Sequence, residues 1–201
     1  MALDPHFTVY RYDAYTKHLQ PEAISDIMSI TPREKHTGLG SYGLSPACRA
    51  VVWAVLRGMK DPLSKWAAKE NIIIPDLHKP LFRPEAFRLE PGSGLWPSPG
   101  RVVVLMPLST GRASVEVMPR GTNYCIPTRW APGLVLFLNE TGIRFTGNGC
   151  LRFIYIMLHK SPLPQKTKET KKAKETKKTK ETKETKMMKM MKKYRFRYYN
   201  A

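Results

Sequence analysis

The sequence predicts an α+β protein in which helices precede a β-rich core and a basic tail follows it. Three observations support this. Between Phe87 and Leu158, short apolar runs alternate with turn clusters of Gly, Pro, Ser and Asn, as is typical of a sandwich or barrel. A strong helical pattern lies before this region, and the composition changes sharply after it. We therefore divide the chain into an N-terminal cap region, 1–86, a β-rich core, 87–159, and a low-complexity Lys-rich tail, 160–201.

The helices that we expect from the sequence lie in the cap region, together with a first strand and a loop. His6–Tyr15 is rich in Tyr, Phe, Val and Thr and is predicted to form a strand, and Pro21–Ile30 is predicted to form a helix with proline in its first turn. Thr31–Tyr42 is polar with several glycines and is predicted to be a loop. Ser45–Glu70 carries the strongest helical pattern, with Ser45 as its cap and a break near Asp61-Pro62.

A short strand is expected at 71–74, and five more in the core. The core strands are Arg101–Leu108, Ala113–Met118, Gly133–Leu138, Ile143–Phe145 and Leu151–Leu158. The first has no polar alternation, so both of its faces should be covered, whereas the second alternates as a half-exposed strand does. A Gly-rich turn separates the last two strands, which predicts a β-hairpin.

The positive charge lies mostly in the tail. From residue 160 to 201 there are 14 Lys and 2 Arg against 4 Glu, a net of +12 out of +18 for the whole chain. The remaining residues carry +6, so the basic composition alone does not predict that the folded part binds nucleic acid.

The tail contains repeats of the type KETKKA, without large apolar residues, and such segments are typically disordered. Its last residues combine Lys and Arg with Tyr and Phe. This combination suits single-stranded nucleic acid or an anionic membrane surface, and a solubilising appendage is the alternative.

Cysteines and apolar runs indicate the compartment. Three cysteines lie far apart without a C-x-x-C pair, which favours a reduced protein. No signal peptide pattern and no run of roughly 20 apolar residues is present, so no transmembrane segment is expected. We expect a cytoplasmic protein, with the nucleus as the alternative.

One close Asp/His pair is a candidate metal site. Asp76 and His78 are two residues apart on a segment held extended by prolines, so their side chains should point to the same side, as a pair of metal ligands must. The alternative is a solvated pair on a loop.

Three segments resemble parts of a known family. They are Val102–Leu108 with Ala113–Gly121, Ala131–Phe137, and Thr146–Arg152. Together they resemble the C-terminal half of the double-stranded β-helix in the phytanoyl-CoA-hydroxylase-like branch of the iron- and 2-oxoglutarate-dependent dioxygenases. The resemblance implies a jelly-roll-like double-stranded β-helix core, and it implies that Arg152 would hold the 2-oxoglutarate carboxylate.

The sequence departs from that family at the metal ligands. Such enzymes need two histidines and one carboxylate on one face of the iron. The segment expected to carry His-x-Asp reads Leu95-Trp96-Pro97-Ser98, and the segment expected to carry the second histidine, Asn139–Ile143, has none. If the fold is that of the family, we therefore expect a barrel that has lost its iron, or a shortened gene product.

The expected function is a non-catalytic or vestigial dioxygenase-like protein with an accessory or ligand-binding role, towards an unknown small molecule, in a specialised biosynthetic pathway. One alternative is a protein that binds polyanions or nucleic acid through residues 160–201. The other is an active oxygenase that binds iron and 2-oxoglutarate with a non-standard metal site at Asp76 and His78.

Overall fold

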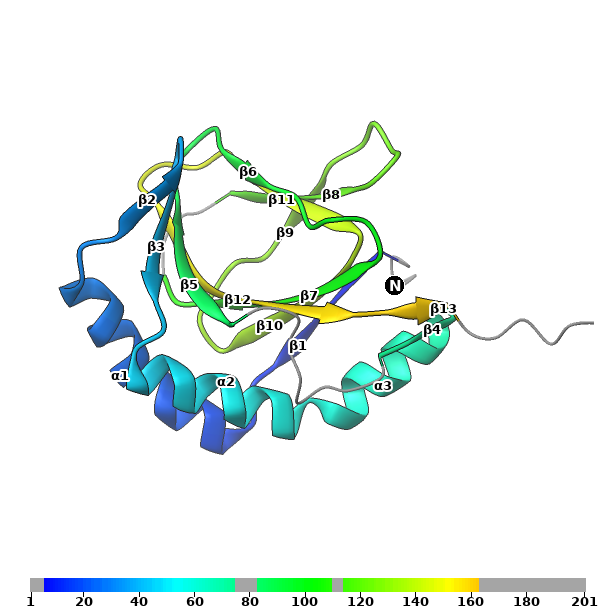
Figure 1. Cartoon of the computed structure of the whole chain (residues 1–201), viewed down its shortest axis with the longest axis horizontal. Helices are drawn as coiled ribbons and strands as arrows, with labels where there is room; N and C mark the ends of the chain where they lie inside the picture. The colour runs from blue at the N-terminus through cyan, green and yellow to red at the C-terminus, as the bar shows by residue number, and fades with distance from the viewer. Residues whose placement is uncertain (1–5, 75–82, 110–113, 163–201) are drawn as a thin grey trace, which may run out of the picture. The chain divides into compact units, whose positions relative to one another are not determined.

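The computed structural model describes residues 6–74, 83–109 and 114–162. Two antiparallel sheets dominate this part of the chain (Figure 1). The larger sheet has the strand order β1-β10-β7-β12-β5-β3-β2, and the smaller has the order β6-β11-β8-β9. The strands of the larger sheet are β1 (Phe7–Arg11), β2 (Arg33–His36), β3 (Leu39–Gly43), β5 (Glu85–Leu89), β7 (Arg101–Pro107), β10 (Leu134–Asn139) and β12 (Leu151–His159). The strands of the smaller sheet are β6 (Gly94–Leu95), β8 (Val115–Pro119), β9 (Ile126–Thr128) and β11 (Thr141–Phe145).

From β5 to β12 the chain crosses repeatedly between the two sheets. Strands β5, β7, β10 and β12 belong to the larger sheet, and β6, β8, β9 and β11 to the smaller one. This is the jelly-roll-like double-stranded β-helix that the resemblance implies. The predicted hairpin between Ile143–Phe145 and Leu151–Leu158 is wrong, because β11 pairs with β6 and β8 whereas β12 pairs with β5 and β7.

The space between the two sheets, called here the barrel interior, is filled by apolar side chains. Trp130 and Phe153 meet edge to face, with ring centroids 5.7 Å apart. The buried members of this cluster are Leu89, Val103, Leu105, Val115, Val117, Trp130, Leu134, Leu136, Leu138, Ile143, Phe145, Leu151 and Phe153. Val102–Leu105 is buried on both faces, which confirms the prediction for this strand.

Helices cover the outer face of the larger sheet (Figure 1). They are α1 (Ala14–Ser29), α2 (Pro46–Gly58) and α3 (Lys60–Lys69). The break between α2 and α3 falls at Met59, just before the predicted position, because Asp61 and Pro62 lie in the first turn of α3. Ser45 caps α2, since its Oγ accepts the Cys48 N–H at 3.1 Å. Buried side chains of α2 and α3 pack on the sheet, where Trp66 lies 5.8 Å from Phe137 between ring centroids.

Two predictions in the cap region need correction. Helix α1 begins at Ala14 and not near Pro21, because Asp13 is its cap and accepts the Thr16 N–H at 2.7 Å. The segment predicted as a loop contains the strand pair β2–β3, which extends the larger sheet beyond β5.

A two-stranded sheet joins β4 (Ile72–Ile73) to β13 (Ser161–Pro162), near the end of the described chain. The short strand expected at 71–74 is therefore confirmed. Within the described residues, no helix combines the length and the apolar character that crossing a membrane requires.

Candidate functional site

The segment 95–98, which begins at the last residue of β6, is one of the two places where the resemblance puts metal ligands. Leu95 pairs with Ile143 and packs on the barrel interior. Trp96 covers Gly142 so closely that a Cβ at residue 142 would lie 2.6 Å from the indole ring. Pro97 is buried, and its carbonyl oxygen accepts a hydrogen bond of 2.6 Å from Arg120 Nη2. Leu95, Trp96 and Pro97 have no side-chain atom suited to iron, and Ser98 offers a hydroxyl and not the imidazole or carboxylate that such sites use.

The second place is the start of β11, where Thr141 is fully buried. Its hydroxyl lies 2.8 Å from the Asn139 carbonyl oxygen and 3.2 Å from that of His6, so the backbone already uses its proton. A hydroxyl in this state is a poor ligand for iron, which in such sites is held by imidazole and carboxylate. The residues at these two places therefore do not fit the iron site of the family.

Arg152 lies on the helix-facing side of β12. Its neighbours Leu151 and Phe153 belong to the barrel interior, whereas Ile154 packs with the helices, so alternation along the strand sends Arg152 away from the interior. Its Nε donates to the Tyr42 hydroxyl at 3.0 Å. Binding of 2-oxoglutarate by Arg152 stays a prediction, and this orientation does not favour it.

The other predicted ligands, Asp76 and His78, lie outside the described residues. In the described ranges, no three side chains among His, Cys, Asp and Glu come together as a metal site would need.

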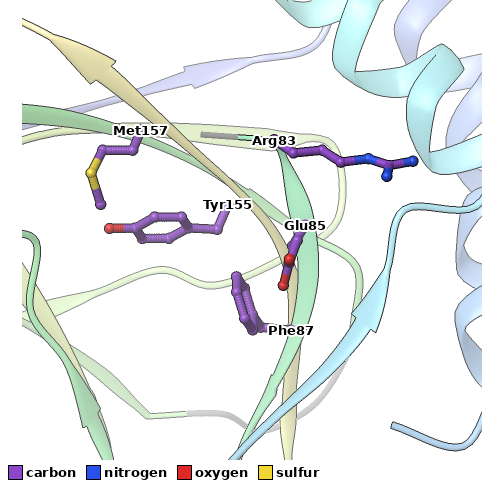
Figure 2. A pocket seen from close by; sticks show the side chains of 5 residues that line it. All are labelled: Arg83, Glu85, Phe87, Tyr155 and Met157. Carbon is purple, nitrogen blue, oxygen red and sulfur yellow. The ribbon is translucent and has the colours of Figure 1, made fainter. Parts of the chain in front are cut away.

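A pocket of about 300 Å³ opens instead beside β5 and β12 (Figure 2). We call it the mouth pocket, and its lining residues are Arg83, Glu85, Phe87, Tyr155 and Met157. The register of the two strands explains the grouping, since Tyr155 lies opposite Glu85 and both strands present every second residue to the same side. Figure 2 shows the Arg83 guanidinium pointing away from the other four side chains, towards a helix.

The walls of the mouth pocket are aromatic. Phe87 and Tyr155 meet edge to face, with ring centroids 5.9 Å apart and planes at 87°. Burial raises the pKa of the Tyr155 phenol above its usual value, so this side chain stays neutral and keeps its proton at neutral pH.

One carboxylate lies among these apolar walls. Glu85 Oε2 accepts the Ser41 hydroxyl at 2.8 Å and lies 3.8 Å from Lys35 Nζ. A carboxylate next to aromatic rings favours a small flat molecule that carries a cation or a hydrogen-bond donor.

The sequence analysis did not identify the mouth pocket. Its residues come from strands about 70 positions apart, and no local motif joins them. Two residues could have pointed to the pocket. Tyr155 places a hydroxyl within the apolar run Leu151–Leu158, and Glu85 places a charge just before the predicted core.

No family model matches the chain, and no curated protein matches it. Solved structures are similar to the chain in fold. A candidate oxygenase from Shewanella oneidensis is similar with a TM-score of 0.50 at 10% identity, over 79% of this chain and 82% of that one. HygX from Streptomyces hygroscopicus, solved with nickel and 2-oxoglutarate, is similar with a TM-score of 0.50 at 14% identity, over 77% of this chain and 82% of that one. The chain therefore has the double-stranded β-helix fold of the dioxygenase-like proteins.

Proposed function

We propose that this chain is a non-catalytic double-stranded β-helix protein that binds a small molecule in the mouth pocket. One observation carries the proposal. The two places where the resemblance puts metal ligands hold Leu95, Pro97 and Thr141, and each of these residues is packed or hydrogen-bonded in its present role. The fold keeps both sheets although the residues at these places are apolar or already hydrogen-bonded. Such a fold can bind a ligand without using metal chemistry.

The chemistry of the mouth pocket supports an aromatic ligand with a positive or donor group. Phe87, Tyr155 and Met157 offer apolar and edge contacts to a ring, and Glu85 offers a carboxylate oxygen. A volume of about 300 Å³ is at the small end of ligand pockets, so the ligand should be little larger than one substituted ring.

We further propose an accessory or ligand-binding role in a small-molecule biosynthetic pathway. This rests on the resemblance to the phytanoyl-CoA-hydroxylase-like branch, whose members commonly act in specialised metabolism. Biosynthetic genes next to the coding sequence would support the pathway role, and neighbours without such enzymes would contradict it.

A metal-binding experiment tests the proposal that the protein is non-catalytic. The full chain is incubated anaerobically with ferrous iron, freed of unbound metal and analysed for iron, and 2-oxoglutarate is then titrated while tryptophan fluorescence is followed. We expect far less than one iron per chain and no saturable quenching. Stoichiometric iron together with saturable quenching would overturn the proposal and favour the oxygenase alternative.

Calorimetric titration with tyramine, an aromatic amine, tests the ligand class. We expect saturable binding of tyramine, no binding of phenylacetate, which has a similar ring but the opposite charge, and at least tenfold weaker tyramine binding by Glu85→Gln. The matched control is Glu90→Gln, which removes an exposed carboxylate paired with Arg88. Equal binding of the two probes, or no effect of Glu85→Gln, would contradict the assigned ligand class.

A further inference from the structure

The solvent-facing side of α2 carries a line of basic and aromatic residues outside the mouth pocket. Arg49, Trp53 and Arg57 are all exposed and follow one another at intervals of four residues, so they lie on one face of the helix. Trp53 is 54% exposed, which is unusual for an indole that faces no partner. We call these three residues the α2 stripe.

Two pockets meet at Trp53. The first, of about 480 Å³, is lined by Arg57 and by Tyr15, which is itself 66% exposed. The second, of about 260 Å³, is lined by Arg49 and Arg83 together with apolar side chains of α2. A ring that lies against the indole would therefore have a guanidinium available on either side of it.

The charges around the α2 stripe favour an anion. No acidic residue in the described ranges forms an ion pair with Arg49 or Arg57. Of the residues that line the two pockets, Asp13 is acidic and caps the start of α1, whereas Arg49, Arg57 and Arg83 are basic, so the positive charges exceed the negative one. The residues before the Lys-rich tail carry a net charge of +6, which also favours an anionic ligand over a cationic one.

The spacing favours a strand of nucleotides over a single nucleotide. Each arginine lies four residues from Trp53, which is about 6 Å along a helix. A base inside a strand has a phosphate on both its 5′ and 3′ sides, whereas a mononucleotide has a phosphate on one side. Single-strand binding sites combine such aromatic platforms with cationic side chains that follow the backbone.

We infer that the α2 stripe binds single-stranded nucleic acid, with a base stacked on Trp53 and the flanking phosphates at Arg49 and Arg57. The three residues of the α2 stripe do not line the mouth pocket, although Arg83 lines both that pocket and the pocket beside Arg49, and the stripe belongs to the folded part of the chain rather than to the Lys-rich tail.

The test uses the full chain and a fluorescein-labelled oligodeoxythymidylate of twelve nucleotides, with anisotropy measured at 50 to 200 mM salt. The tail is present in every variant, so its contribution is common to all of them. We expect Trp53→Ala to weaken binding at least about fivefold at each salt concentration. The double substitution Arg49→Ala/Arg57→Ala should also lower the salt slope by about 1.4, because two phosphate contacts are lost.

Matched controls distinguish a loss of this site from the general effect of removing any exposed tryptophan or any two positive charges. Trp96→Ala removes the other strongly exposed tryptophan of the described chain, and Arg33→Ala/Lys65→Ala removes two exposed cations elsewhere. Both should bind like the unmodified chain, and circular dichroism should show that all variants are folded.

Equal binding by Trp53→Ala and Trp96→Ala would overturn the inference, as would an unchanged salt slope in the arginine variant. The same holds if an oligoglutamate peptide competes as well as the oligonucleotide, because the stripe would then recognise acidic peptides. Failure of this test leaves the mouth pocket untouched, since the two sites share neither Trp53 nor the arginines of α2.

Discussion

At the scale of single residues, the contact between Trp96 and Gly142 explains how side chains fill one of the places where the resemblance puts metal ligands. The indole occupies the space that any larger residue at 142 would need, and the Leu95 carbonyl oxygen would lie 3.0 Å from the same Cβ. Glycine is thus required here by close approach and not by backbone conformation.

Gly142→Ala should lower the free energy of unfolding by about 1–3 kcal/mol, because the new methyl group overlaps the ring of Trp96. In a Trp96→Ala background the same substitution should cost clearly less, although the nearby Leu95 carbonyl prevents complete relief. Urea denaturation of the four chains measures the coupling. Equal costs in the two backgrounds would show that the ring does not limit the space at 142.

Glu140 should make the stability depend on pH. Hydrogen bonds from Lys160 and from the Gly100 N–H hold the pKa of its carboxyl below its usual value. A carboxyl with a lowered folded pKa stabilises the protein above its unfolded pKa of about 4.3, and this contribution disappears as the pH falls through the folded pKa.

Glu140→Gln should therefore be less stable than the unmodified chain at pH 7, and the difference should shrink as the pH falls below 4. Chemical denaturation at pH 7, 5, 4 and 3 tests this. Glu34→Gln, at an exposed position of β2, is the control and should show little difference at any pH. A difference for Glu140→Gln that does not change with pH would contradict the ion-pair explanation.

At the scale of elements, local patterns predicted the parts of the fold that local forces determine. The helices α2 and α3 and the buried strand β7 were predicted because apolar spacing, a capping serine and continuous β-branched residues are visible in short windows. Strand β2, REKH, was missed because every residue is exposed at the edge of the sheet, so no apolar alternation marks it. Pro21 suggested a helix start, but Asp13 and its bond to Thr16 begin the helix earlier.

The cap of α2 should contribute measurably to stability. Ser45→Ala removes the oxygen that accepts the Cys48 N–H and should lower the free energy of unfolding by about 1 kcal/mol. Ser29→Ala is the matched control, because its hydroxyl bonds the exposed Asp26 carbonyl near the end of α1, and it should cost much less. Equal costs in urea denaturation would mean that Ser45 is not the effective cap.

At the scale of the whole molecule, pairing between distant segments determines what the sequence could not show. The expected hairpin of β11 and β12 was wrong because crossing between sheets, and not the turn between neighbours, sets the partners of each strand. The mouth pocket was missed for the same reason, since Glu85 and Tyr155 meet only through the register of β5 and β12. The absence of histidines at 95–97 and 139–143, by contrast, was readable directly from the sequence.

The stability of the folded part should not depend on the residues after Leu163. Both apolar cores consist of residues before this point. A chain that ends at Leu163 should therefore melt within about 2 °C of the full chain.

A chain that ends at Lys160 is the matched comparison, because it also lacks β13 and leaves Ile72 and Ile73 without their pairing strand. It should melt about 2–4 °C lower, as expected for a loss of roughly 1 kcal/mol in a domain of this size. Equal melting of the two truncated chains would show that β13 does not stabilise the fold, and a large loss on ending at Leu163 would show that the tail does.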